Sequence, residues 1–76
     1  SERIELTKKE FEILKLLLDN QTRVFSRDDI LQAVWGGDVI VTNRTVDVNI
    51  TRLRTKLGKY GNYLRNKTGY GYYFEI

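Results

Sequence analysis

The sequence predicts an α+β domain with three helices and a C-terminal β-hairpin. Three observations lead to this prediction: amphipathic periodicity in three segments, polar capping residues before them, and two β-prone runs around a glycine-bearing turn. The chain has 76 residues, which is enough for one domain with one core. We therefore expect a single domain over residues 1–76.

The N-terminal part predicts a short strand followed by a helix. Residues 3–6 alternate polar and apolar side chains, which is typical of a strand. Thr7 and Glu10 have the spacing of a capping box, so we expect a helix from Lys8 to Asp19. Its apolar residues should form one buried stripe, widened by Ile13 and Leu16. The stripe consists of Phe11, Leu14, Leu17 and Leu18.

A second helix should follow a β-prone stretch at residues 23–25, which we expect to add one strand to a small sheet. Ser26 is the predicted N-cap, and two acids follow it in the first turn, where the helix dipole favours them. The helix should run to about Trp35 and end at Gly36 and Gly37. Its inward side chains should be Ile30, Leu31 and Val34.

The third helix should run from about Arg44 to Leu57, with Asn43 or Thr42 as its cap and Gly58 as its end. One side of its helical wheel is apolar and should face the core; it holds Val46, Ile50, Leu53 and Leu57. The opposite side contains no acid and holds Arg44, Thr45, Val48, Thr51, Arg52 and Thr55. The two flanks hold Asn49 with Lys56, and Asp47 with Arg54.

After a loop at residues 59–62, the chain carries the signature of a hairpin. Two β-prone runs, 64–68 and 72–76, flank a turn at residues 69–71. We expect the alternating residues of the second run to face the core: Tyr72, Phe74 and Ile76. A strand, three helices and a hairpin in this order form a winged helix-turn-helix plan.

Composition and charge exclude several classes of function. The chain has no histidine and no cysteine, so common general bases, metal sites and disulfides are absent, and we expect no cofactor and no enzyme activity. There is no long apolar run, so we expect no membrane partner. Residues 1–42 carry six basic and eight acidic side chains, whereas residues 43–76 carry seven basic and two acidic ones. This asymmetry fits a polyanionic partner, although a solvated basic face would look the same.

The third helix and the hairpin suggest how a polyanion would be bound. Arginine can bind guanine bidentately, threonine can contact sugar–phosphate or base edges, and the methyl groups of Val48 can meet thymine. An amphipathic helix with a solvated outer face would carry similar residues. The basic hairpin could lie along a phosphate backbone or enter a minor groove, or its glycines could only close the turn.

Five blocks of sequence carry a resemblance that covers almost the whole chain. They are residues 6–14, 24–27, 33–36, 44–57 and 69–74. Together and in this order they resemble the OmpR/PhoB family of bacterial response-regulator output domains. The resemblance implies a winged helix with a truncated N-terminal sheet, of which only the strand at residues 3–6 is present. The chain contains no methionine, so we expect a fragment of a longer protein with an upstream receiver domain.

The resemblance also implies partners and a cellular place. Family members bind double-stranded promoter DNA at direct repeats as homodimers, with the third helix in the major groove. They act in two-component regulatory systems in the bacterial cytoplasm, on the nucleoid. The segment from residue 37 to 42 matches the part of the family that can touch RNA polymerase. In this chain the polymerase loop comprises Gly37, Asp38, Val39, Ile40 and Val41.

Site residues follow from the matching positions. The resemblance assigns direct base contacts to Val48 and Arg52, and backbone or groove contacts to Arg44, Thr45 and Asn49; we group Thr45 and Asn49 with the base contacts. It assigns backbone contacts to Arg27, Trp35 and Arg54, and the helical wheel adds Thr51, Thr55 and Lys56 as candidate backbone contacts. Arg54 is partly structural in the family, and a network with Asp47 on the same flank competes with a phosphate contact. The hairpin contacts would come from Arg65, Lys67, Thr68 and Tyr70.

Two positions depart from the family pattern. Thr68 and Tyr73 stand where the family often has arginine, so the hairpin contact would depend on Lys67 or Tyr70. One competing hypothesis is a winged helix that binds only other proteins, with residues 39–41 as an apolar docking patch. Core packing beneath the third helix would explain the same loop. Another is a membrane-anchored regulator that carries the same DNA-binding module.

Overall fold

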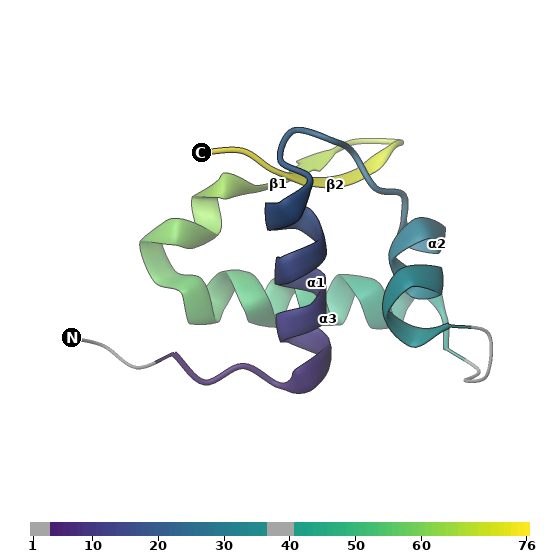
Figure 1. Ribbon diagram of the computed structural model, residues 1–76, viewed down its shortest axis with the longest axis horizontal. Helices are drawn as coiled ribbons and strands as arrows, with labels where there is room; N and C mark the ends of the chain where they lie inside the picture. Colours follow the sequence, from purple (N-terminus) through teal and green to yellow (C-terminus); the bar gives the residue numbers. More distant parts are fainter. Residues whose placement is uncertain (1–3, 37–40) are drawn as a thin grey trace.

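The structure is a computed structural model that describes residues 4–36 and 41–76. In the described residues, five helical segments precede a two-stranded sheet, and the second of these segments continues directly into the third. Their bounds are α1 (Lys8–Asp19), α2 (Arg27–Ile30), η1 (Leu31–Trp35), α3 (Asn43–Leu57), η2 (Gly58–Tyr63), β1 (Leu64–Lys67) and β2 (Gly71–Phe74). In Figure 1, α1 crosses α3, α2 lies near one end of α3, and the hairpin lies over one end of α1.

The predicted bounds of α1 and its capping box are confirmed. The Thr7 hydroxyl accepts a hydrogen bond from the Glu10 amide at 3.2 Å, and Glu10 Oε1 accepts one from the Thr7 amide at 2.9 Å. The expected strand at residues 3–6 is wrong for residues 4–6, which form no strand, while Arg3 lies outside the described residues. This segment pairs with no described strand that could supply backbone hydrogen bonds.

The predicted buried stripe of α1 is partly wrong. The fully buried residues are Glu10, Ile13 and Leu17, whereas Phe11 is 56% exposed and Leu18 is also exposed. Six apolar residues between positions 11 and 18 give the helix two candidate apolar faces. Packing against α3 buries the face that contains Ile13 and Leu17, and leaves Phe11 and Leu18 outside the core.

The predicted second helix forms as α2 followed directly by η1, a wider turn of π-helix. Ser26 caps it with a second capping box, since the Asp29 amide donates to the Ser26 hydroxyl at 3.0 Å and the Asp29 carboxylate accepts from the Ser26 amide. Ile30 and Val34 are buried, as predicted. Gly36, with a φ of +69°, ends the segment in a conformation that suits glycine.

The third helix has the predicted apolar side. Val46, Ile50 and Leu53 are fully buried, and Leu57 packs partly against them. Asn43, the first choice for the N-cap, is wrong, because it is the first helical residue; the alternative, Thr42, is the N-cap, without a side-chain cap bond. None of the described helices is both long enough and apolar enough to cross a membrane.

The hairpin, called the wing below, pairs β1 with β2 in antiparallel register from Leu64↔Phe74 to Lys67↔Gly71. Tyr72 and Phe74 are buried as expected, but Ile76 is exposed because it lies beyond the end of β2. The loop expected at residues 59–62 is part of the 3₁₀ helix η2. The β-prone residues 23–25 contribute one bridge rather than a strand.

That bridge joins the wing to the chain in front of α2. The Phe25 amide donates to the Tyr72 carbonyl at 2.8 Å, and the Tyr72 amide donates to the Phe25 carbonyl at 2.9 Å. A side chain on the neighbouring Gly71, whose φ is +144°, would overlap the Phe25 carbonyl. A glycine at this point therefore allows the two backbones to approach each other.

Candidate nucleic-acid interface

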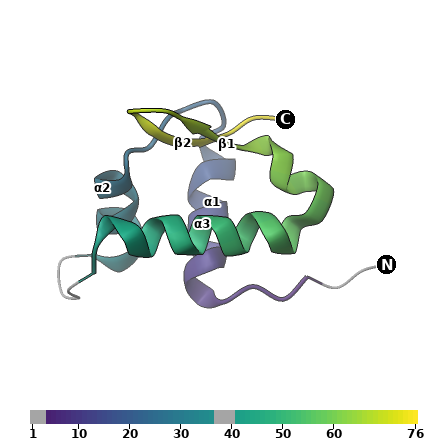
Figure 2. The same cartoon turned by 180° about the vertical axis from the view of Figure 1, so that it is seen from behind.

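The outer side of α3 is an open surface on one side of the molecule. In Figure 2, α3 lies in front of α1 and α2, and no other ribbon passes across it. The exposed side chains on this surface are Arg44, Val48, Thr51, Arg52 and Thr55, with Thr45 and Asn49 half-buried beside them. Val48 is 37% exposed, so an apolar side chain is presented among the polar ones. The structure thus brings together most residues predicted on this helix.

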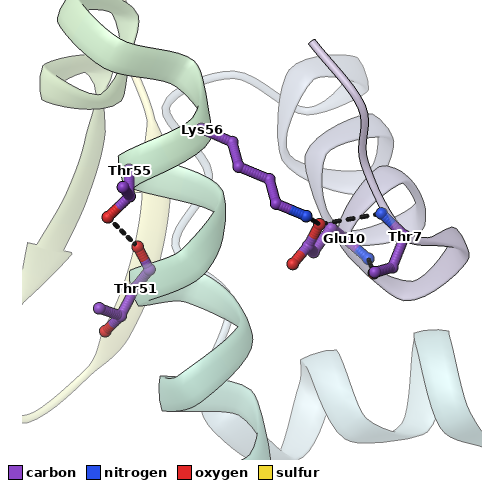
Figure 3. Close-up of polar contacts among 5 residues, drawn as sticks. All are labelled: Thr7, Glu10, Thr51, Thr55 and Lys56. Carbon is purple, nitrogen blue, oxygen red and sulfur yellow. Dashed lines mark hydrogen bonds and ion pairs between the residues drawn. The ribbon is translucent and has the colours of Figure 1, made fainter.

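Some of these polar groups are already bonded to the helix. The Asn49 side-chain amide donates to the Thr45 carbonyl at 2.8 Å. The Thr55 hydroxyl donates to the Thr51 carbonyl at 3.1 Å, as Figure 3 shows. Arg44 and Arg52 differ, because neither makes a hydrogen bond or an ion pair with another residue that the structure describes. Their guanidinium groups remain available to an external acceptor.

A polar network links α2, α3 and the wing. One carboxylate oxygen of Asp47, Oδ1, lies 2.9 Å from Arg27 Nε and accepts a hydrogen bond from the Tyr72 hydroxyl at 2.6 Å. The hydrogen bond with Asp47 raises the pKa of Arg27 above its ordinary value. Burial, followed by the hydrogen bond with Asp47, raises the pKa of the Tyr72 hydroxyl. Arg27 and Tyr72 therefore keep their protons at neutral pH.

A groove of about 320 Å³ lies beside this network. We call it the wing groove; it is lined by Ser26, Arg27, Asp28, Asn43, Asn66, Thr68, Gly69, Tyr70, Gly71 and Tyr72. The starts of α2 and α3 form part of its lining, and the turn of the wing forms the rest. Three predicted contact residues, Arg27, Thr68 and Tyr70, thus share one concave surface.

The basic residues of the wing are exposed, as are Thr68 and Tyr70 in its turn. Lys67 Nζ lies 5.1 Å from the centre of the Tyr70 ring, within the range of a cation–π contact. Arg65 pairs in register with Tyr73 across the hairpin. The wing therefore presents positive charge next to an aromatic ring.

Two predicted backbone contacts have partners inside the protein. Lys56 Nζ lies 2.6 Å from Glu10 Oε1 (Figure 3). Arg54 Nε donates to the Leu64 carbonyl at 2.9 Å, and its guanidinium lies 5.7 Å from the centre of the Tyr72 ring. The predicted network of Arg54 with Asp47 is thus indirect, because both residues contact Tyr72. These interactions give Lys56 and Arg54 roles in holding α3 to its neighbours.

Trp35 is half-buried against the core, and a lysine covers its ring. Lys9 Nζ lies 5.5 Å from the centre of the Trp35 ring and donates to the Val34 carbonyl at 2.9 Å. Of the predicted polymerase loop, residues 37–40 lie outside the described residues, and Val41 is half-buried. The sequence did not reveal the role of Lys9, because nothing in its spacing indicates a partner in the next helix.

Glu10 is a buried acid that sequence reasoning treated only as a capping residue. Burial alone would raise the pKa of its carboxyl, but the hydrogen bonds from Lys56 and Thr7, together with the positive charge of Lys56, outweigh burial and lower it. The position of Glu10 among apolar residues of α1 was the available signal. Among the described residues, no cluster of three or more metal-ligating side chains occurs.

Comparison with known sequences places the chain among transcriptional regulatory proteins. A family model described as "Transcriptional regulatory protein, C terminal" matches residues 1–74. The chain is 42% identical over 72 residues to the phosphate regulon transcriptional regulatory protein PhoB of Pseudomonas aeruginosa. The matched region covers 93% of this chain and 31% of that protein. The chain thus spans about a third of the length of the curated relatives that it matches.

Solved structures share the fold described above. The DNA-binding domain of CssR from Bacillus subtilis has a TM-score of 0.83 and 38% identity, over 95% of this chain and 80% of that one. The DNA-binding domain of the response regulator AdeR, solved in complex with an intercistronic region, has a TM-score of 0.81 and 31% identity. That match covers 96% of this chain and 74% of the AdeR chain.

Proposed function

The chain belongs to the family of transcriptional regulatory protein C-terminal domains, of the OmpR/PhoB type, and on this basis we propose that it binds double-stranded promoter DNA sequence-specifically. In this proposal it regulates transcription as the output domain of a bacterial two-component response regulator. The observation that carries the proposal is the open, acid-free outer surface of α3 in Figure 2.

Helix α3 would lie in the major groove. The exposed guanidinium of Arg52 can donate two hydrogen bonds to one guanine, and Val48 can pack against a thymine methyl group. Thr45 and Asn49, whose side chains lie next to them, would complete the set of base contacts. Arg44, Thr51 and Thr55 would contact the backbone from the same surface.

The wing would lie along the backbone or in the adjacent minor groove. Its exposed Arg65 and Lys67 supply positive charge, and Tyr70 supplies an aromatic ring at the tip. The wing groove brings Arg27 to the same side, at the first position of α2. One phosphate strand could then contact both the start of α2 and the turn of the wing.

The longer protein would add partners. We propose that it contains an upstream receiver domain, binds direct repeats as a homodimer in the bacterial cytoplasm, and contacts RNA polymerase through residues 37–41. Support comes from relatives that are named as a transcriptional regulatory protein and a response regulator and that are about three times as long as this chain. Trp35, at the end of η1, would add a backbone contact near this loop.

Selection of bound duplexes from a random pool tests the proposal. We expect the pool to converge on one half-site, and the affinity for that half-site to fall steeply with rising salt, since bound phosphates release counterions. A scrambled duplex should bind more weakly. Lys15→Ala, which removes an exposed positive charge on α1, should leave the affinity for the selected half-site almost unchanged. A chain that enriches no sequence and binds no duplex at low salt would instead favour the protein-binding hypothesis.

A further inference from the structure

Asp47 is the only acidic residue on α3. It lies on the flank of a helix that, under the proposed function, approaches a polyanion. An acid at that position repels phosphate, so its direct electrostatic effect on DNA binding is unfavourable. Its contacts suggest a compensating role.

The Asp47 carboxylate is held by a fixed point of the wing. Tyr72 is buried, and both its backbone amide and its backbone carbonyl are hydrogen-bonded to Phe25. Its hydroxyl donates to Asp47 Oδ1 at 2.6 Å, and Arg54 covers its ring. Because the ring is packed and the backbone is bonded, the hydroxyl and the carboxylate have little freedom to move.

The carboxylate in turn holds Arg27 by one nitrogen. Arg27 Nε lies 2.9 Å from Asp47 Oδ1, and the Arg27 side chain is otherwise half-exposed at the wing groove. Within the described part of the chain, Asp47 is the only acid that forms an ion pair with the Arg27 guanidinium. A guanidinium held through Nε still offers its two terminal nitrogens as donors.

We propose that Asp47 is a positioning residue for DNA binding: with Tyr72 it orients the Arg27 guanidinium so that the terminal nitrogens face a phosphate at the wing groove. The proposal rests on the proposed function, because it assumes that a duplex occupies this side of the molecule. Asp47 itself touches no DNA. A preoriented arginine loses less side-chain entropy when it binds, which offsets the repulsion from the nearby carboxylate.

A pair of charge-matched variants separates this role from simple repulsion. Asp28 lines the same groove and carries the same charge, and its side chain forms no hydrogen bond or ion pair with another described residue. Asp28→Ala should therefore tighten duplex binding slightly or leave it unchanged. Asp47→Ala removes the same charge, yet we expect it to weaken binding about three- to tenfold, the effect of losing one ordinary hydrogen bond, because Arg27 keeps its charge but loses its orientation.

Two further measurements identify the route of the effect. Asp47→Ala should make the salt dependence shallower by about one phosphate contact, because Arg27 no longer holds its phosphate. In an Arg27→Ala background, Asp47→Ala should lose its weakening effect. Tyr72→Phe changes no charge and removes only the hydroxyl, so it should weaken binding to a smaller degree, and it tests the network even if Asp47→Ala does not fold.

The proposal is overturned if Asp47→Ala tightens binding as Asp28→Ala does. It is also overturned if Asp47→Ala weakens binding equally with and without Arg27, because Asp47 would then act through folding. Both results require a wild-type chain that binds DNA. A wild-type chain that binds no duplex is a different outcome, in which the proposed function itself fails and the inference fails with it.

Discussion

Lys56, in the last turn of α3, forms an ion pair with Glu10, in the first turn of α1, with Nζ 2.6 Å from Oε1. Glu10 is only 1% exposed, and the same oxygen accepts the Thr7 amide of the capping box. One carboxylate therefore both starts α1 and fixes where α1 crosses α3. Figure 3 shows the Lys56 ammonium and the Thr7 backbone amide meeting at the Glu10 carboxylate.

Lys56→Met should destabilise the fold by about 1–3 kcal/mol, because it leaves the buried Glu10 charge without its partner. This loss of unfolding free energy is smaller than the loss expected for a fully buried ion pair, because the Lys56 side chain is 36% exposed and water screens the interaction. Urea unfolding measures the change. The control is Lys15→Met, which breaks the exposed Lys15–Asp19 pair and should cost less than about 0.5 kcal/mol. Equal losses in the two variants would contradict a structural role for Lys56.

Acid should weaken the fold through Glu10. The pKa of its carboxyl in the folded chain lies below the ordinary value of 4.5, so its contribution to stability is complete above pH 4.5. That contribution is lost as the pH falls through the lower folded pKa. Glu10→Gln should reduce the loss of stability below pH 4.5, as measured by unfolding at a series of pH values. An unchanged pH profile in Glu10→Gln would show that other carboxylates dominate acid unfolding.

Arg52→Ala should cost about 1–3 kcal/mol of binding to the selected half-site and relax the preference at one base position. The reason is that Arg52 is exposed on the acid-free side of α3, with no bond to another described residue. Binding to a panel of single-base variants of the half-site measures this preference. If all duplexes weaken equally, Arg52 contacts phosphate and does not read a base.

Arg27→Ala should lower affinity for every duplex by a similar factor and flatten the salt dependence by about one contact. Arg27 lies at the first position of α2 beside the wing groove, and under the proposed function it would contact the DNA backbone rather than base edges. Titration at several salt concentrations gives the slope. A changed base preference in this variant would instead place Arg27 in a groove of the DNA.

Gly71→Ala should destabilise the fold far more than Gly69→Ala. Both glycines have positive φ, so alanine is strained at either position by about 1–2 kcal/mol. An added Cβ at Gly69 meets open space, whereas at Gly71 it overlaps the Phe25 backbone and must displace the wing. Thermal unfolding of the two variants checks this order. Similar melting temperatures would mean that the Phe25–Tyr72 bridge can open at little cost.

Local signals predicted most of the secondary structure. The capping boxes of Thr7 and Ser26 and the glycine after Leu57 set the helix ends, because these features act within one turn of the chain. Glycine placement likewise predicted the hairpin turn, at residues 69–71, whereas the structure has it one residue earlier, at 68–70, because Gly71 pairs in β2. The apolar side of α3 was correct because that helix has a single apolar stripe.

Features that depend on a partner distant in the sequence were not predicted. α1 has two candidate apolar faces, and only its contact with α3 decides which one is buried. The contact of Lys56 with Glu10 was not predicted, because the two residues lie in different helices. Arg54 was expected to be partly structural, but its expected partner was Asp47 rather than the Leu64 carbonyl. Asp47 gave no sign of its contact with Tyr72, because the sequence places the two residues in different elements.

The Phe25–Tyr72 bridge has a consequence for the order in which the molecule assembles. Each helix and the hairpin can form from neighbouring residues, whereas the bridge closes a loop that contains α2, α3 and β1. Closing so long a loop costs chain entropy, and only the contacts of the completed core offset that cost. We therefore expect the wing to dock late in folding. For the same reason, we expect undocking of the wing to be the easiest partial unfolding step, in which β2 detaches from Phe25 while the helices stay packed. Amide protons of Phe25 and Tyr72 should then exchange with solvent sooner than those of Ile50 and Leu53.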